Sequence, residues 1–250
     1  FTSIYAPKDK SISYPILITR MPFNSEPNKD SYSRFLSYLP HLIKEKYILV
    51  LQDVRGKYMS EGEFVEVRPY NPNKKNKETD ENSDAYDTID WLVHNVDNNN
   101  GNVGVFGISY MGFYATMTLP NAHPALKAVS PQVPVTDWFL GDDRHHNGAF
   151  FLMDSFPKSA AMGKPRNGPT RPSSKVPFDY KNKDNYAFYK ELGPIKNMQQ
   201  KPTVQTNKFW SDLIKHPNYD SFWKARHVLP HLKNIVPAVL VVGGWFDAED

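Results

Sequence analysis

The stretch from Asn102 to Gly112, NVGVFGISYMG, decides the fold. Its first half is a continuous run of apolar and β-branched residues, which is typical of a strand buried on both faces. Ser109 follows that run directly, and a helical pattern begins at Tyr110. A serine at this junction, with glycines on either side, indicates a sharp strand-to-helix turn that holds its hydroxyl at the carboxyl edge of a sheet.

This turn carries the groups that nucleophilic chemistry needs. Ser109 is the candidate nucleophile, and the backbone N–H of Tyr110 points to the same place, where it is a candidate oxyanion donor. The general motif has glycine two residues after the serine, whereas here Met111 holds that position and Gly112 comes next. The alternative interpretation is a tight turn with an incidental serine.

The alternation of strand and helix continues on both sides of the turn. A polar loop is expected at Asn71–Asp84, and Ser83 is the expected N-cap of a helix with apolar residues such as Ile89 on one stripe. The alternation predicts an α/β fold with a mainly parallel sheet. Strands are expected at residues 1–7, 15–19, 47–53, 102–109, 126–131 and 238–244, and further helices at 33–46, with a possible break at Pro40, and at 110–119.

Between residues 137 and 230 the alternation stops, and proline, aromatic residues and short helical pieces take its place. The chain has 21 Pro among 250 residues and is 14% aromatic, so this segment is expected to be ordered, because disordered segments are poor in aromatics. We expect residues 137–230 to form a helical cap, inserted between the first part of an α/β core, 1–136, and its continuation, 231–250. Most aromatic side chains of the cap are expected in its own core.

Composition excludes several classes of function. Thirty Lys and Arg against 27 Asp and Glu give a net charge of +3, which does not indicate a nucleic-acid partner. No apolar run is long enough for a membrane-spanning helix. The absence of cysteine excludes disulfides, thiolate zinc sites and a cysteine nucleophile. No metal-ligand spacing is present, so neither a metal nor a cofactor is expected.

A second motif lies at the end of the chain, where Asp247 follows a buried strand. This is the position of the acid in a Ser–Asp–His triad, although an aspartate there is equally compatible with a plain helix N-cap. The chain begins at Phe1 and stops within this motif, so we expect a piece of a longer protein that supplies the histidine after Asp250. All eight histidines precede the motif: His41, His94, His123, His145, His146, His216, His227 and His231.

Three motifs together resemble those of one family. The first is Gln52–Tyr58 followed by Ser60–Gly62, the second is Asp84 with Asp87–Leu92, and the third is Ser109–Tyr110 with Gly112. The chain resembles the α-amino acid ester hydrolases, which are grouped with cocaine esterase, the glutaryl-cephalosporin acylase-like proteins and the X-prolyl dipeptidyl aminopeptidases. The resemblance implies an α/β-hydrolase with a helical cap, and a jelly-roll domain beyond this chain. It also implies hydrolysis through an acyl-enzyme, with Ser109 as nucleophile and Asp247 as triad acid.

The resemblance further implies a set of three carboxylates that bind the α-ammonium group of the substrate, and these match Asp143, Glu249 and Asp250. The expected substrates are therefore small acyl esters or amides, in particular α-amino acid esters or β-lactam-type amides. Ordinary helix-terminal acids are the alternative for these three residues. Two other functions stay open, an aminopeptidase that releases X-Pro dipeptides and a non-catalytic binding protein on a hydrolase scaffold. A homo-oligomer is possible, and nothing indicates a compartment.

One residue departs from the family pattern. The family commonly has a tyrosine as second oxyanion donor in a Thr-Arg-x-Pro-Tyr segment, but this chain has Phe23 at that position. Losing one oxyanion donor typically costs about 2.7–4 kcal/mol in the transition state. Tyr58 is a candidate substitute. Phe23 is otherwise expected to be a core ring at the end of a strand.

Overall fold

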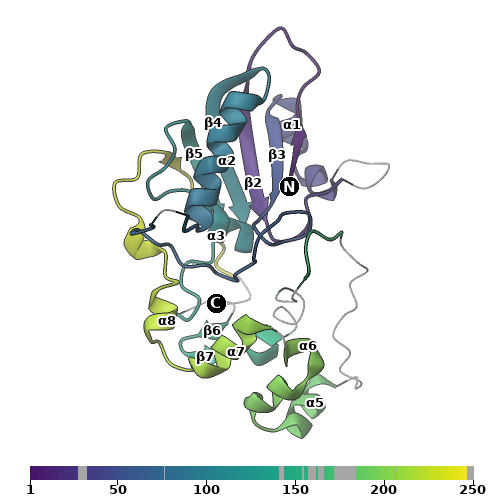
Figure 1. Cartoon of the computed structure of the whole chain (residues 1–250), viewed down its shortest axis with the longest axis vertical. Coiled ribbons are helices and arrows are strands. Elements are labelled where there is room, and N and C mark those ends of the chain that lie inside the picture. Colours follow the sequence, from purple (N-terminus) through teal and green to yellow (C-terminus); the bar gives the residue numbers. More distant parts are fainter. Residues whose placement is uncertain are drawn as a thin grey trace.

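The structure is a computed structural model that describes residues 1–27, 33–75, 77–140, 144–153, 155–156, 162, 166–171, 184–205 and 207–246. Figure 1 shows a sheet with flanking helices in the upper part of the view and a second body of short helices below it. We call the upper part the sheet body. We call the described residues between 137 and 230 the helical region.

The sheet body is organised around six strands in the order β1-β3-β2-β4-β5-β8. Strand β1 runs antiparallel to β3, and the other neighbouring strands are parallel. The mainly parallel sheet expected from the sequence is thus present. The strands are β1 (Thr2–Tyr5), β2 (Tyr14–Met21), β3 (Ile48–Asp53), β4 (Asn99–Ile108), β5 (Leu126–Gln132) and β8 (Ala238–Val239).

Both faces of the sheet are covered, because side chains alternate between them along each strand. Ile18 and Val50 face helices α2 (Glu81–Asn95) and α3 (Tyr110–Thr116), which pack on one side. Residues of opposite parity, such as Leu49, face the 3₁₀ helix η1 (Arg34–Tyr38) and α1 (Pro40–Lys44) on the other side. Pro40 begins α1, so the helix expected over 33–46 is divided at this proline.

Helix α2 begins earlier than its sequence pattern suggests. Its N-cap is Asp80, whose side chain accepts from the N–H of Ser83 at 2.8 Å, and the hydroxyl of Ser83 accepts from the N–H of Asp80 at 3.0 Å. The two residues form a reciprocal capping box, which satisfies two N–H groups at the helix start. The expectation that Ser83 is the N-cap is therefore wrong, since it lies at the third helical position.

The helical region is built from short elements around a ring-rich core. Trp138, Trp210 and Trp223 are each at most 1% exposed, and they pack in one cluster with Tyr110 and Phe113 of α3. The core of the helical region is therefore continuous with the part of the sheet body formed by α3. The elements are β6 (His145–His146), β7 (Ala149–Phe150), α5 (Asn185–Leu192), η2 (Ile195–Gln200), α6 (Pro202–Gln205), α7 (Lys208–Lys215) and α8 (Ser221–Lys224), with η3 (Leu229–His231) leading back to the sheet.

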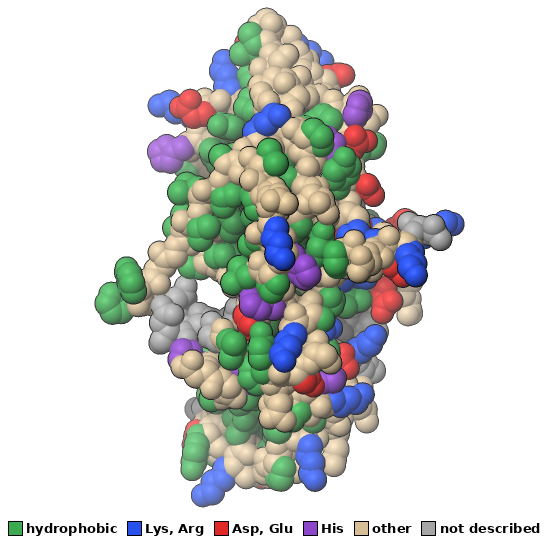
Figure 2. Space-filling view, turned by 90° about the vertical axis from the view of Figure 1, so that its left-hand side faces the viewer, with side chains coloured by type: hydrophobic (Ala, Val, Ile, Leu, Met, Phe, Trp, Pro, Cys, Tyr) green, Lys and Arg blue, Asp and Glu red, His purple; other side chains and the backbone are tan. Residues whose placement is uncertain are grey.

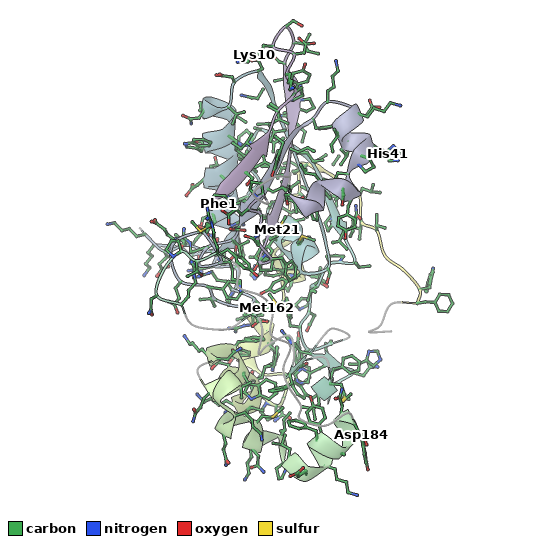
Figure 3. The ribbon with its side chains drawn as sticks, turned by 90° about the vertical axis from the view of Figure 1, so that its right-hand side faces the viewer. Phe1, Lys10, Met21, His41, Met162 and Asp184 are labelled. Atoms are coloured by element: carbon green, nitrogen blue, oxygen red, sulfur yellow. The ribbon has the colours of Figure 1, made fainter. Side chains whose placement is uncertain are left out.

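The two bodies meet where the parallel strands end. Figure 3 places Met21, the last residue of β2, just above Met162 at this junction. The side chain of Lys57, in the loop after β3, donates to the carbonyl of Met162 at 2.9 Å. The carboxyl edge of the sheet is thus the edge that faces the helical region.

The edge strand β8 is shorter than the run of residues 238–244 suggests. Beyond Val239, Leu240 and Val242 still donate to carbonyls of β5, at 3.0 and 3.1 Å. Leu240 is 65% exposed, and Figure 2 shows hydrophobic side chains spread over this side of the molecule. Within the described residues, no helix has the length and apolar character needed to cross a membrane.

Candidate active site

The serine of the predicted turn lies where β4 leads into α3. Ser109 has φ 59° and ψ −123°, a left-handed φ that is unusual for a residue with a side chain. Its N–H donates to the carbonyl of Gln132 on β5 at 2.9 Å, and its carbonyl accepts from the N–H of Phe113 at 3.1 Å. The residue is exposed, and its side chain makes no capping hydrogen bond to α3. The backbone is therefore fixed while the hydroxyl stays accessible.

Two glycines make this turn possible. A Cβ atom on Gly107 would lie 2.2 Å from the carbonyl oxygen of Met111, and one on Gly112 would lie 2.8 Å from that of Gln132. Both contacts are with backbone atoms, which cannot rotate away as a side chain can. The close approach is made by Gly112, three residues after the serine, so the turn forms although Met111 occupies the usual glycine position.

Tyr110 contributes differently through its backbone and its ring. As the first residue of α3 it has an N–H with no acceptor one turn earlier in the helix, so this group remains the candidate oxyanion donor beside Ser109. Its ring is 5% exposed and stacks on Tyr114 with centroids 5.1 Å apart. Its hydroxyl accepts from the N–H of Val67 at 3.0 Å. Burial raises the pKa of this hydroxyl, so the ring remains a neutral core group.

The other site residues expected from the sequence fall outside the described part of the chain. The structure therefore brings only the serine and its following N–H together, and the roles of the remaining residues stay predictions. The residues in question are Asp143, Asp247, Glu249 and Asp250.

Phe23 lies in the turn after β2 and is 45% exposed, so the interpretation as a core ring is wrong. Tyr58 is half-buried with φ 42°, and burial raises the pKa of its hydroxyl. The hydroxyl is therefore protonated near neutral pH and able to donate a hydrogen bond. Its part in an oxyanion hole stays a prediction.

Arg55 belongs to a separate group of charges beneath α2. Arg20, Arg55 and Asp84 line an open pocket of about 350 Å³ between β3 and α2, and neither Glu81 nor Ser109 is among its lining residues. Arg55 donates twice to Asp84, at 2.9 and 2.6 Å, and Arg20 lies 3.3 Å from Glu81. Burial raises the pKa of Glu81 although Arg20 opposes the shift. Because these charges pair with one another, Arg55 is a structural anchor of its loop.

His145, in β6, packs within the ring core of the helical region. His145 is 3% exposed and stacks on Phe139 with ring centroids 4.2 Å apart. Burial lowers its pKa to about 4, so the ring is neutral at physiological pH. Among the residues that the structure describes, no cluster of three or more His, Cys, Asp or Glu side chains could hold a metal ion.

One buried ion pair near the turn at Ser109 was not predicted from the sequence. Glu66, in the loop between β3 and α2, pairs with Arg144 of the helical region at 2.6 Å. The two residues are 78 positions apart, and neither lies in a periodic pattern or a recognised motif. Only knowledge of the tertiary contact could have linked them.

A family model described as X-Pro dipeptidyl-peptidase, S15 family, matches residues 1–250. The chain belongs to this family. The resemblance to the group that includes cocaine esterase and the α-amino acid ester hydrolases is confirmed. This chain is thus a member of a hydrolase family.

Three relatives of this chain support its assignment to the S15 family. Cocaine esterase of Rhodococcus sp. (strain MB1 Bresler) is 24% identical over 256 residues, which cover 98% of this chain and 41% of the esterase. An aminopeptidase from a marine sediment archaeon, Thaumarchaeota archaeon, is 34% identical with a TM-score of 0.82, over 98% of this chain and 40% of the aminopeptidase. A selenomethionine-labelled α-amino acid ester hydrolase is 32% identical with a TM-score of 0.79, over the same shares. The predicted α/β-hydrolase fold is confirmed, and the chain spans about two fifths of the length of these relatives.

Proposed function

We propose that this chain provides the nucleophile and much of the substrate pocket of a serine hydrolase that cleaves small acyl esters or amides through an acyl-enzyme. The observation that carries the proposal is the backbone of Ser109, held at φ 59° between two glycines that tolerate no side chain. A structure retains such strain where the surroundings enforce it, and strained residues cluster at active sites. An incidental serine would not require this conformation.

The chemistry proceeds in two steps. The hydroxyl oxygen of Ser109 attacks the acyl carbon, its proton passes to a histidine, and the N–H of Tyr110 stabilises the oxyanion that forms. The histidine then gives the proton to the leaving alcohol or amine, and water later hydrolyses the acyl-enzyme. Asp247 orients the histidine, which the order Ser–Asp–His puts after Asp247 in the chain. Phe23 donates nothing, so Tyr58 is the proposed source of a second oxyanion hydrogen bond.

The proposed substrates carry a free α-amino group. Asp143, Glu249 and Asp250 would bind the ammonium, because a small cation beside the acyl carbon needs several acceptors. Two relatives, an aminopeptidase and an α-amino acid ester hydrolase, support a substrate with a free amine. Release of X-Pro dipeptides is the second candidate, and the family description favours it.

The experiment uses a protein that contains this chain together with the histidine of the triad. A fluorophosphonate probe is expected to label Ser109, and Ser109→Ala is expected to abolish both the labelling and the turnover of an α-amino acyl ester. Hydrolysis at the wild-type rate by Ser109→Ala would disprove the assignment. Faster cleavage of an X-Pro anilide than of the ester would favour the aminopeptidase. A wild-type protein that neither reacts with the probe nor cleaves either substrate would favour the binding scaffold.

A further inference from the structure

The loop between β3 and α2 contains a buried carboxylate that reaches into the helical region. Oε1 of Glu66 accepts from Nη2 of Arg144 at 2.6 Å, and the two side chains are 1% and 2% exposed. Separating the two charges would leave each one unpaired in a poorly solvated site, which is unfavourable. The paired arrangement therefore keeps the two side chains at a defined distance. This ion pair therefore joins the two bodies at a fixed separation.

In the helical region, Arg144 contacts several segments at once. Nη1 donates to the carbonyl of Ser155 at 3.1 Å, and the guanidinium lies 5.5 Å from the ring centroid of Phe209. Its backbone carbonyl accepts from the N–H of Phe151 at 2.9 Å. A lysine could not reproduce this arrangement, since it lacks the planar fork that serves two acceptors. Arg144 thus contacts Phe151, Ser155 and Phe209 together.

On the side of the sheet body, the next residue holds the same loop to the turn at Ser109. Val67 is β-branched, 1% exposed and has φ 51°, a conformation that such a residue adopts only when its surroundings impose it. Its N–H donates to the hydroxyl of Tyr110, the residue after Ser109. Glu66 and Val67, adjacent in sequence, therefore connect the serine turn with the helical region.

We propose that Glu66 is a positioning residue, which acts through Arg144 to set where the start of the helical region lies relative to Ser109. Glu66 need not touch the substrate for this role. The part of the inference that concerns substrate selection rests on the proposed function, because Asp143, the proposed ammonium ligand, directly precedes Arg144 in the sequence.

The kinetic test replaces Glu66 by glutamine, which keeps the shape and removes the charge. In Glu66→Gln, KM for an α-amino acyl ester is expected to rise about tenfold or more, while KM for the matching ester without the amine changes less than about threefold. The kcat values are expected to stay within about threefold, since the serine turn is held by its own glycines and by Gln132. Glu66→Asp retains the charge and is expected to recover part of the selectivity.

A matched control is Glu81→Gln, which removes another buried carboxylate paired with an arginine, but within the sheet body. Amide hydrogen exchange gives a second measurement that needs no activity. Glu66→Gln is expected to reduce protection of the amides of Val67 and Phe151 together, and Glu81→Gln is expected to leave both protected.

The outcomes separate the two proposals. Equal changes for both esters, or equal loss of amide protection in Glu81→Gln, would show that Glu66 supports only stability and would overturn the positioning role. A wild-type protein that hydrolyses neither the ester nor an X-Pro anilide would refute the proposed function alone, because the exchange measurement still decides whether Glu66 couples the two bodies.

Discussion

The sheet body and the helical region are held together in different ways. In the sheet body, strand hydrogen bonds, alternating side chains and obligatory glycines fix the backbone, and the alternation and the glycines are local features of the sequence. In the helical region, α5 and α7 have only eight residues each, and large rings such as Trp210 fill the core. Helices this short are marginal alone, so contacts between distant residues must stabilise them. The comparison predicts that the sheet body is sensitive to backbone changes and the helical region to changes in its buried rings.

The largest effect is expected for the close backbone contact within the serine turn. Gly107→Ala places a methyl group 2.2 Å from the carbonyl oxygen of Met111. We expect the free energy of unfolding to fall by about 4 kcal/mol or more, because neither backbone segment can relax without opening the turn. Urea denaturation measures this loss, and Gly243→Ala is the control, since a Cβ there has no atom within 4 Å. A cost below about 1.5 kcal/mol would show that the turn adapts more easily than its geometry indicates.

The same difference explains which features the sequence predicted. The strands and the serine turn were predictable, because period-two alternation, buried apolar runs and Gly107 with Gly112 are local signals. The start of α2 was misplaced, since both Asp80 and Ser83 suit an N-cap and only the reciprocal hydrogen bonds distinguish them.

The contacts between the bodies were not predictable. Glu66 and Arg144 are both charged residues in irregular segments, and such residues are ordinarily exposed. Their burial depends on the packing of Phe209 and the rest of the helical region around them. The same holds for Phe23, for which the sequence suggested a core position while the structure leaves the ring 45% exposed. Of the candidate site, the turn at Ser109 was predictable, and the residues expected around it stay predictions.

The ring core of the helical region makes a prediction about acid stability. Burial lowers the pKa of His145 to about 4, below the ordinary value of 6.5. As pH falls below 6.5, the unfolded chain takes up the proton before the folded one does, so stability decreases until about pH 4. The shift corresponds to a loss on the order of 3 kcal/mol across this window.

The measurement is the free energy of unfolding by urea at several pH values. His145→Gln is expected to show a shallower decline between pH 6.5 and pH 4, whatever its stability at neutral pH. His41→Gln removes an exposed histidine of α1 and is expected to leave the decline unchanged. If His145→Gln declined as steeply as the wild type, the acid sensitivity would have to come from other groups.

The smallest effect is expected where an arginine pairs within the sheet body. The side chain of Arg55 is 36% exposed, so water compensates much of its lost pairing in Arg55→Gln. Asp84 keeps a second cation, Arg20, at 3.9 Å and also lies in the first turn of α2, where the helix dipole favours an acid. We expect a loss of about 1 kcal/mol or less, which high salt reduces further.

Arg144→Gln is the matched comparison, because it also removes an arginine from a carboxylate at 2.6 Å. Here the guanidinium is withdrawn from a carboxylate that stays buried between the two bodies, and the expected cost is about 3–5 kcal/mol with little dependence on salt. Urea unfolding at low and high salt measures both. Equal costs for Arg55→Gln and Arg144→Gln would mean that the junction depends no more on its ion pair than the sheet body does, and that ring packing and hydrogen bonds such as that of Lys57 join the two bodies.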